Sequence, residues 1–204
     1  MIIIGIAGGT GSGKSTVVRK LIERLPCGEV ALMPQDSYYR DSSNVPMEDR
    51  QKINFDHPDS IEFELLVRHL HELKKGNSIQ QPIYSYLTCT RAHETIPVQP
   101  CHVVIVEGIL VLNNAPLRKM LDLKVFVDAD ADDRLIRVIN RDIKERGRSV
   151  AAVIERYEKI LKPMHQQFIE PAKCFADIIV PQGGENHVAI DILTRYIENC
   201  LLKR

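Results

Sequence analysis

The sequence has no excess of charge of either sign and no apolar run long enough to cross a membrane. Its 204 residues carry 27 Lys and Arg against 27 Asp and Glu. Because nucleic-acid-binding proteins usually carry a basic excess, the balance argues against a nucleic-acid partner. A bilayer span needs about 20 apolar residues, and glycines follow at once after Met1-Ile2-Ile3-Ile4. We therefore expect no membrane association and no signal peptide.

Cysteine is present, but in no pattern that builds a disulfide framework or a zinc site. The residues are Cys27, Cys89, Cys101, Cys174 and Cys200. Their number is odd and no two form a C-x-x-C pair, so we expect neither use. Reduced thiols are typical of a cytoplasmic protein, which is the location we predict.

Apolar strand-like runs alternate with amphipathic segments along the whole chain. We expect strands at 2–6, 29–33, 103–106, 123–127 and 178–180, and helices at 16–25, 59–75, 130–145, 151–161 and 188–202. This alternation predicts an α/β fold with a central parallel sheet flanked by helices, in a single domain over 1–204.

Three segments carry more specific expectations. Asp59 and Glu62 form a capping-box pattern at the start of one predicted helix, and Gly76 ends that helix. The predicted helix 130–145 has apolar residues on one face, at Leu135, Ile139 and Ile143. The segment at about 79–99 contains prolines and β-forming residues, so we predict a β-hairpin or extended excursion there.

A phosphate-binding loop is the strongest motif in the chain. Gly8-Gly9-Thr10-Gly11-Ser12-Gly13-Lys14-Ser15 matches G-x-x-x-x-G-K-[ST] in full. The glycines let backbone N–H groups wrap phosphate oxygens, Lys14 supplies a charge at the β and γ phosphates, and the Ser15 hydroxyl can ligate Mg²⁺. An apolar strand before the loop and a helix after it are the context that the motif requires.

An acidic partner for the metal ends the predicted strand 103–106. P-loop enzymes place a carboxylate there to hold Mg²⁺, and in this chain it is Glu107. The alternative is an acid at a strand end that faces solvent.

Two absent motifs narrow the kind of P-loop protein. Switch GTPases read guanine through N-K-x-D and sense the γ-phosphate through D-x-x-G, and neither string occurs. A short chain with a second substrate region is typical of a small-molecule kinase. Such an enzyme needs a carboxylate for the acceptor hydroxyl, cations on the transferred phosphoryl group and a lid that excludes water.

Asp36 is the candidate carboxylate. It lies in Pro34-Gln35-Asp36-Ser37-Tyr38-Tyr39, directly after the second predicted strand. Ligands bind at the carboxyl edge of a parallel sheet, so this position favours a catalytic base. An Asp beside Ser37 is also typical of a turn.

The candidate cations recur at three- and four-residue steps, at Arg134, Arg137, Arg141 and Lys144. Glu145-Arg146-Gly147-Arg148 extends this basic stripe into a hinged cationic lid over about 141–156. We expect Arg134 and Lys144 to lie on a solvated face, paired with Asp133 or Glu145. We expect Arg141, Arg146 and Arg148 to contact phosphate or substrate.

At this level of detail the chain resembles the uridine (uridine–cytidine) kinase family over essentially its whole length. The strings that carry the resemblance are Gly8 to Thr16, Gln35-Asp36-Ser37-Tyr38-Tyr39, Asn54-Phe55-Asp56-His57-Pro58, Pro82-Ile83-Tyr84-Ser85-Tyr86, Glu107-Gly108-Ile109-Leu110, Phe126-Val127-Asp128, Arg141-Asp142 through Glu145-Arg146-Gly147-Arg148, and Ala176-Asp177-Ile178-Ile179-Val180-Pro181. Together they are far more specific than the phosphate loop alone.

The resemblance implies transfer of the γ-phosphate of ATP or GTP to the 5′-hydroxyl of uridine or cytidine, with Mg²⁺, in a homotetramer. It implies that Asp36 and Lys14 are catalytic, that Ser15 and Glu107 serve the metal, and that the nucleotide is bound by Gly8 to Thr16, Arg141, Arg146 and Glu185. It further implies that the nucleoside meets Asp56 at its ribose hydroxyls, Tyr84 and Tyr86 at its base, and Arg148. On the residues alone, Asp56 before His57-Pro58 could simply shape a turn, and the two tyrosines could be ordinary strand aromatics.

The chain departs from the family's usual residues at four positions. Cys89 stands where His is usual, Val138 where Arg is usual, Arg156 where Gln is usual, and Gln182 where Arg is usual. The first three positions belong to the nucleoside site, where a thiol is a poor substitute for a directional hydrogen-bonding ring.

These departures leave the identity of the acceptor substrate undecided. Arg156 could compensate by donating to a carbonyl or acidic group, or it could be a surface residue. Three hypotheses remain: a uridine or cytidine kinase, a P-loop kinase of another small hydroxyl substrate, and a non-catalytic nucleotide-binding module.

Overall fold

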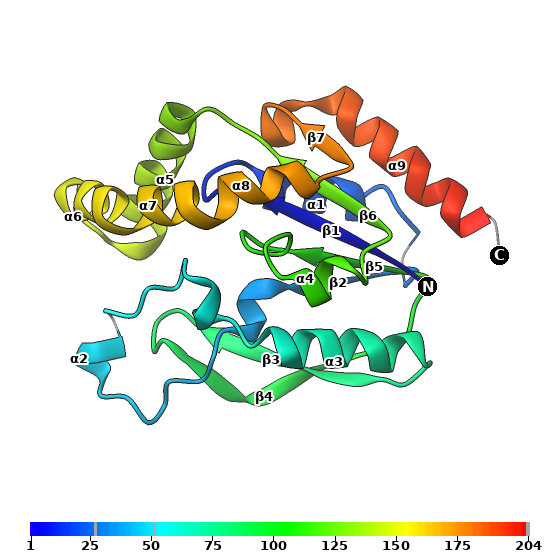
Figure 1. The fold of residues 1–204 in the computed structure, drawn as a ribbon, viewed down its shortest axis with the longest axis horizontal. Helices are drawn as coiled ribbons and strands as arrows, with labels where there is room; N and C mark the ends of the chain where they lie inside the picture. The colour runs from blue at the N-terminus through cyan, green and yellow to red at the C-terminus, as the bar shows by residue number, and fades with distance from the viewer. Residues whose placement is uncertain (27, 51, 203–204) are drawn as a thin grey trace.

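The computed structural model of the protein describes residues 1–26, 28–50 and 52–202 (Figure 1). Its strands are β1 (Ile2–Gly8), β2 (Val30–Pro34), β3 (Ile79–Ser85), β4 (Thr90–Val98), β5 (Val103–Glu107), β6 (Leu123–Val127) and β7 (Ile178–Val180). Its helices are α1 (Lys14–Ile22), α2 (Met47–Arg50), α3 (Phe63–Lys74), α4 (Ala115–Arg118), α5 (Ala131–Arg146), α6 (Val150–Arg156), α7 (Lys162–Met164), α8 (Glu170–Ala172) and α9 (His187–Leu202).

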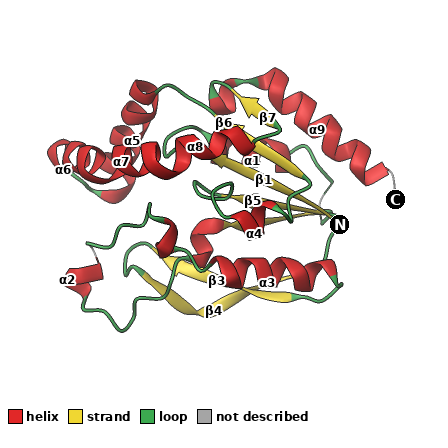
Figure 2. Cartoon of the chain, in the orientation of Figure 1, coloured by secondary structure: helices red, strands yellow, loops and turns green. Residues whose placement is uncertain are grey.

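A five-stranded parallel sheet in the order β2-β5-β1-β6-β7 forms the centre of the molecule. Alternate residues of β1 point to opposite faces. Ile3 packs in a core with α3 and α4, whereas Ile4 packs in a core with α1 and α9. Both faces are therefore covered, which is why the strands are almost wholly apolar. Figure 2 shows helices on both sides of the sheet.

The expected hairpin is confirmed as β3 and β4, which pair antiparallel as a separate two-stranded sheet beside α3 (Figure 1). The α/β prediction is confirmed as well, and the strand bounds differ from the expected ones by two residues at most. Within the described residues, no helix is both long and apolar enough to cross a bilayer.

The capping box predicted at Asp59 is wrong. Residues Pro58–Ser60 form a 3₁₀ turn, with Asp59 N–H donating to His57 Nδ1, and α3 begins only at Phe63. Glu62 precedes α3 without a capping hydrogen bond and instead accepts from Arg91 Nη1 at 2.7 Å. Tertiary pairing with β4 has replaced the local cap.

The buried face of α5 also differs from the expected one. Arg134, Val138 and Asp142 are buried, whereas Ile143 is exposed. The helix therefore turns two charged groups inward beside Val138, which packs in a small apolar cluster. Buried charges of this kind indicate a polar site next to the helix.

The helix predicted at 151–161 is much longer than expected. After α6 the chain continues helically through π-helical segments at Tyr157–Leu161 and His165–Ile169, then α8 and a 3₁₀ turn at Lys173–Phe175. Each π segment ends two residues before a proline, Pro163 or Pro171. A wider turn accommodates proline, whose missing N–H leaves one carbonyl without its usual donor.

Four of the cysteines, Cys89, Cys101, Cys174 and Cys200, are free thiols. Cys27 lies outside the described residues.

Candidate active site

The phosphate loop connects β1 to α1. Gly13 precedes the first turn of α1 with φ +91° and no side-chain cap. The first N–H groups of α1 are thus left without a capping side chain, which makes the helix start suited to an anion. A side chain at position 13 would strain this backbone, so glycine is required by geometry.

Two arginines of α5 support this loop from behind. Arg137 Nη1 donates to the carbonyls of Gly11 at 3.3 Å and Ser12 at 3.4 Å. Arg134 is buried, donates from Nε to Ala129 O at 3.2 Å, and its backbone fills the space where a Cβ of Gly11 would lie. The prediction that Arg134 lies on a solvated face is therefore wrong, because the loop packs directly against α5.

Ser15 and Glu107 lie together, as a shared metal site requires. The Ser15 hydroxyl donates to Glu107 Oε1 at 3.2 Å, and Lys14 Nζ lies 3.6 Å from the same oxygen. A hydroxyl and a carboxylate are oxygen ligands of the kind that Mg²⁺ takes, with water and substrate phosphate completing its shell. Among the described residues no cluster of three or more His, Cys, Asp or Glu could hold a metal alone, so the pair fits a metal that arrives with the triphosphate.

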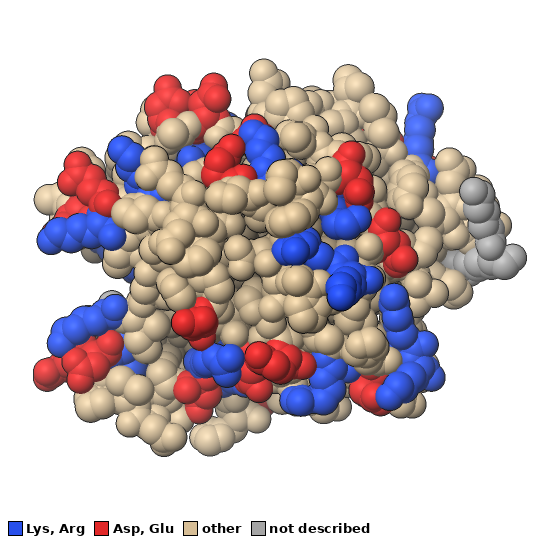
Figure 3. Space-filling view, in the orientation of Figure 1, with Lys and Arg blue, Asp and Glu red and all other residues tan. Residues whose placement is uncertain are grey.

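A cleft of about 910 Å³ opens beside the phosphate loop. Figure 3 shows the surface hollowed at the left of the view, between the part that carries α6 and the part that carries α2. The cleft brings together most of the predicted site residues: Thr10, Lys14, Asp36, Asp56, Tyr84, Tyr86, Cys89, Arg141, Arg146, Arg148 and Arg156.

Asp36 faces this cleft from the 3₁₀ turn after β2. The Tyr86 hydroxyl donates to Asp36 Oδ2 at 2.5 Å. Burial and the Asp36 charge both raise the pKa of Tyr86, so its phenol stays protonated and remains the donor. Asp36 is thus an acceptor whose present partner is a hydroxyl group.

Four aromatic rings line one wall of the cleft. Tyr39, Phe55, Tyr84 and Tyr86 contact each other edge-on or tilted, with ring centroids 5.0 to 6.5 Å apart. The Tyr84 hydroxyl is buried and has no hydrogen-bond partner among the described residues. A wall of this kind suits a flat ring with polar edges.

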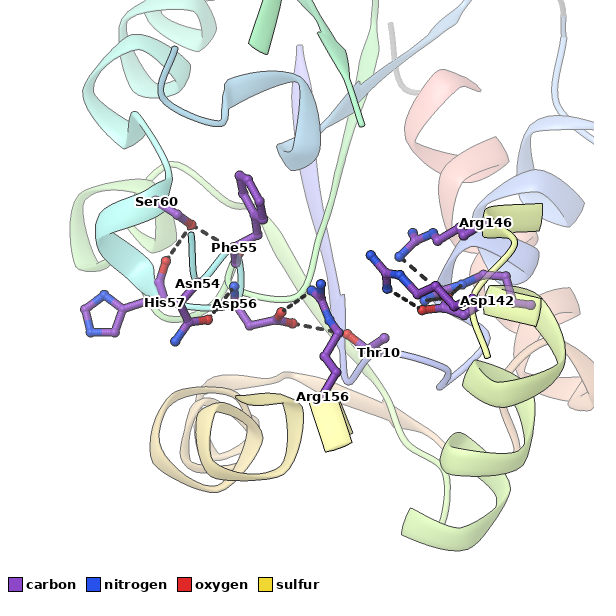
Figure 4. A network of polar contacts seen from close by, with 11 residues as sticks. Thr10, Asn54, Phe55, Asp56, His57, Ser60, Asp142, Arg146 and Arg156 are labelled. Carbon is purple, nitrogen blue, oxygen red and sulfur yellow. Dashed lines mark hydrogen bonds and ion pairs between the residues drawn. The ribbon is translucent and has the colours of Figure 1, made fainter. Parts of the chain in front are cut away.

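Asp56 is a buried carboxylate on the same cleft. Asn54 stabilises the backbone turn here, because its Oδ1 accepts a hydrogen bond from Asp56 N–H at 3.1 Å. The Asp56 side chain is therefore not the group that shapes the turn. Burial raises the pKa of Asp56, while the charges of Arg156 and Lys14 oppose that rise. Figure 4 shows its carboxylate in contact with Thr10 and Arg156.

Three arginines gather on one buried carboxylate at the opposite wall (Figure 4). Asp142 accepts from Arg141 Nε at 2.9 Å and from Arg148 Nη1 at 2.6 Å, and Arg146 Nη1 lies 3.5 Å away. Burial raises the pKa of Asp142, but the Arg141 hydrogen bond and the three positive charges outweigh it and lower the pKa. The cluster carries two more positive than negative charges, so it suits phosphate.

Some predicted residues lie elsewhere. Val138 is buried with Val153 and Leu161 and is not among the cleft-lining residues, although Leu161 is, so its place in the nucleoside site stays a prediction. Glu185 is exposed, in the 3₁₀ turn Gly183–Glu185 that packs on α1, outside the cleft.

The departures Cys89 and Arg156 both face the cleft. Cys89 lies in the hairpin turn with φ +52°, and its thiol is 3.6 Å from Tyr86 O. Arg156 Nη2 is 3.5 Å from Asp56 Oδ2, so it is an ion-pair partner within the site and not a surface residue.

Asp142 is a functional candidate to which the sequence analysis gave no role. The signal was available: arginines stand one residue before it and four and six residues after it. Arg137 was named only as part of the basic stripe. Its contact with the phosphate loop had no local signal, because its partners are backbone carbonyls more than 120 residues away.

Comparison with known proteins agrees with a phosphate-binding kinase site. Residues 3–189 match the Phosphoribulokinase / Uridine kinase family. The "Uridine kinase" of Clostridium novyi (strain NT) is 52% identical over 98% of this chain and 96% of its own length. The "Uridine kinase" of Bacillus cytotoxicus is 50% identical over 98% and 94%.

Solved structures share the fold. D-glycerate 3-kinase from Cryptococcus neoformans var. grubii has a TM-score of 0.63 at 18% identity, over 84% of this chain and 80% of that chain. A structure described as a possible uridine kinase from Bacillus stearothermophilus has a TM-score of 0.56 at 21% identity, over 88% of each chain. With the phosphate loop, the carboxylate at the end of β5 and the family match in agreement, the chain belongs to the phosphoribulokinase / uridine kinase family.

Proposed function

We propose that the protein is a uridine/cytidine kinase, which transfers the γ-phosphate of ATP or GTP to the nucleoside 5′-hydroxyl and gives UMP or CMP. The observation that carries the proposal is that Asp36, whose carboxylate accepts a hydrogen bond from the Tyr86 hydroxyl, shares one cleft with Lys14 of the phosphate loop and with an aromatic wall. Relatives about 50% identical over nearly the whole chain are named uridine kinases.

Asp36 is the general base in this account. The acceptor hydroxyl replaces that of Tyr86 at Asp36 Oδ2, and its oxygen attacks the γ-phosphorus as its proton passes to the carboxylate. The bond from the γ-phosphorus to the bridging oxygen breaks, and the nucleoside diphosphate leaves. Lys14 binds the β and γ phosphates, as a point charge in this loop does.

Ser15 and Glu107 would hold Mg²⁺, which neutralises phosphate charge when bound. Arg141 and Arg146 would move from Asp142 to the transferred phosphoryl group. The crowding of positive charge favours that move, because burial and neighbouring Arg141 lower the pKa of Arg146. The segment at about 141–156 would act as the lid that excludes water.

Asp56 would accept hydrogen bonds from the ribose hydroxyls, with Tyr84 and Tyr86 against the base and Arg148 nearby. From the resemblance to the family we further propose a role in pyrimidine salvage as a cytoplasmic homotetramer, with one kinase domain over 1–204 and the hairpin at about 79–99 as an excursion.

A coupled assay of triphosphate consumption with a nucleoside panel tests the proposal. Uridine or cytidine should be turned over, with ATP or GTP as donor. The panel also includes sugar phosphates and vitamins, so that another hydroxyl acceptor would be found. Turnover of neither pyrimidine nucleoside would end the proposal.

A further inference from the structure

Asp56 is a charged side chain with few partners. Its side chain is 8% exposed, yet only two side-chain groups in the described part of the chain contact the carboxylate. Thr10 Oγ1 lies 3.5 Å from Oδ1 and Arg156 Nη2 lies 3.5 Å from Oδ2, both at the long limit of a hydrogen bond. A carboxylate accepts about four hydrogen bonds, so the Asp56 oxygens can accept further hydrogen bonds from a molecule in the cleft.

The charges around Asp56 come from several elements. Asp36, after β2, raises its pKa, whereas Lys14 at the start of α1 and Arg156 on α6 lower it, and Arg156 contributes more than Lys14. Tyr39 packs nearby with a strongly raised pKa and stays neutral. Lys14 has its own partner in Glu107. Arg156 is therefore the cation within ion-pair distance of Asp56.

Arg156 reaches Asp56 from a segment 100 residues further along the chain (Figure 4). It lies on α6, within the segment proposed as the lid, and its side chain is 25% exposed. Across the described residues, Asp56 is the one acceptor that its guanidinium contacts. The remaining N–H donors of the Arg156 guanidinium are therefore available on the acceptor side of the cleft, where the polar substrate would bind.

We propose that Arg156 is a positioning residue, which keeps Asp56 ionised and its carboxylate directed into the acceptor side of the cleft. This inference rests on the proposed function, in which Asp56 accepts the ribose hydroxyls. An ionised carboxylate is an acceptor on both oxygens and can bind two neighbouring hydroxyls. A protonated carboxyl carries a donor that would compete with them. An acceptor with a vicinal diol is therefore the ligand class that Arg156 prepares the site to bind.

The test compares three variants of the full-length enzyme. Arg156→Met removes the charge at similar length without installing the Gln that is usual in the family, and Arg156→Lys retains the charge. Lys162→Met is the matched control, since Lys162 follows on the same helical stretch, is exposed and is not among the cleft-lining residues. Each is assayed for kcat and KM of nucleoside and triphosphate between about pH 4 and about pH 9.

Arg156→Met should raise the nucleoside KM about tenfold at neutral pH. The acid limb of kcat/KM for the nucleoside should move up by about one pH unit, as expected when a neighbouring opposite charge is removed. The KM of the triphosphate should stay within about threefold. Arg156→Lys and Lys162→Met should both keep the wild-type acid limb. An acid limb of Arg156→Met that coincides with the wild-type limb would overturn the inference, whatever happens to the melting temperature.

The role of Arg156 can still be tested if no nucleoside is turned over and the proposed function fails. The Asp56 carboxyl is then titrated directly by ¹³C NMR in the wild type and in Arg156→Met. A higher midpoint in the variant supports the role of Arg156, and equal midpoints refute it.

Discussion

Replacing Asp142 by Asn tests whether one buried carboxylate holds the three lid arginines. Its side chain is 2% exposed and faces Arg141, Arg146 and Arg148, each 33% exposed. Removing one partner of a buried ion pair costs about 3–5 kcal/mol. We take the lower end, about 3 kcal/mol, because the arginines are partly solvated and the amide still accepts a hydrogen bond. For a chain of this length that lowers Tm by roughly 6–12 °C.

The assay is thermal unfolding followed by circular dichroism, with Asp133→Asn as control. Asp133 lies on the same helix, is 60% exposed and is 4.0 Å from Arg137, so its loss should cost less than about 1 kcal/mol. Equal melting temperatures for the two variants would refute the reasoning.

The same variant has a pH signature. The pKa of Asp142 is lower in the folded protein than in the unfolded chain, so its contribution is present above the unfolded-state value and is lost as the pH falls through the folded-state value. Wild type and Asp142→Asn should therefore differ in Tm at neutral pH and converge in acid. A difference that grows on acidification would contradict this assignment.

Two further predictions concern the phosphate loop and the catalytic base. Gly183 and Gly147 have nearly equal φ of +61° and +62°, but a Cβ at Gly183 would lie 2.2 Å from Ser12 O whereas none is near Gly147. In urea unfolding, Gly147→Ala should cost about 1 kcal/mol and Gly183→Ala about 2 kcal/mol more; equal costs would show that the turn does not press on the loop. Tyr86→Phe removes the hydroxyl that occupies Asp36, so the nucleoside KM should fall about fivefold with little change in kcat. A fall of kcat by about a hundredfold would instead mean that this hydroxyl positions the base.

Local pattern was sufficient for the sheet and for most of the cleft. The strands are continuous apolar runs because both faces of a parallel sheet are buried, and such runs are visible without a structure. Asp36 and Glu107 directly follow or end strands, so their place at the carboxyl edge followed from the strand prediction. Asp56 and Arg156 were named by resemblance to a family, not by spacing.

Tertiary contacts decided what sequence could not. Arg134 reads as a surface residue, yet the phosphate loop covers it. The helix expected to end at residue 161 continues past Pro163 and Pro171 through π turns. Val138 differs from the family's usual residue, and it is buried against Val153 and Leu161. In each case the deciding partner is distant in sequence or depends on backbone geometry, which no local window contains.

The role of Asp36 is tested most directly by Asp36→Asn, measured for kcat and for triphosphate affinity in the same preparation. If Asp36 takes the acceptor proton, kcat should fall about a thousandfold while the Kd of the triphosphate changes less than about twofold. An unchanged kcat would contradict the account, since the cleft would then hold the acceptor without this carboxylate as its base.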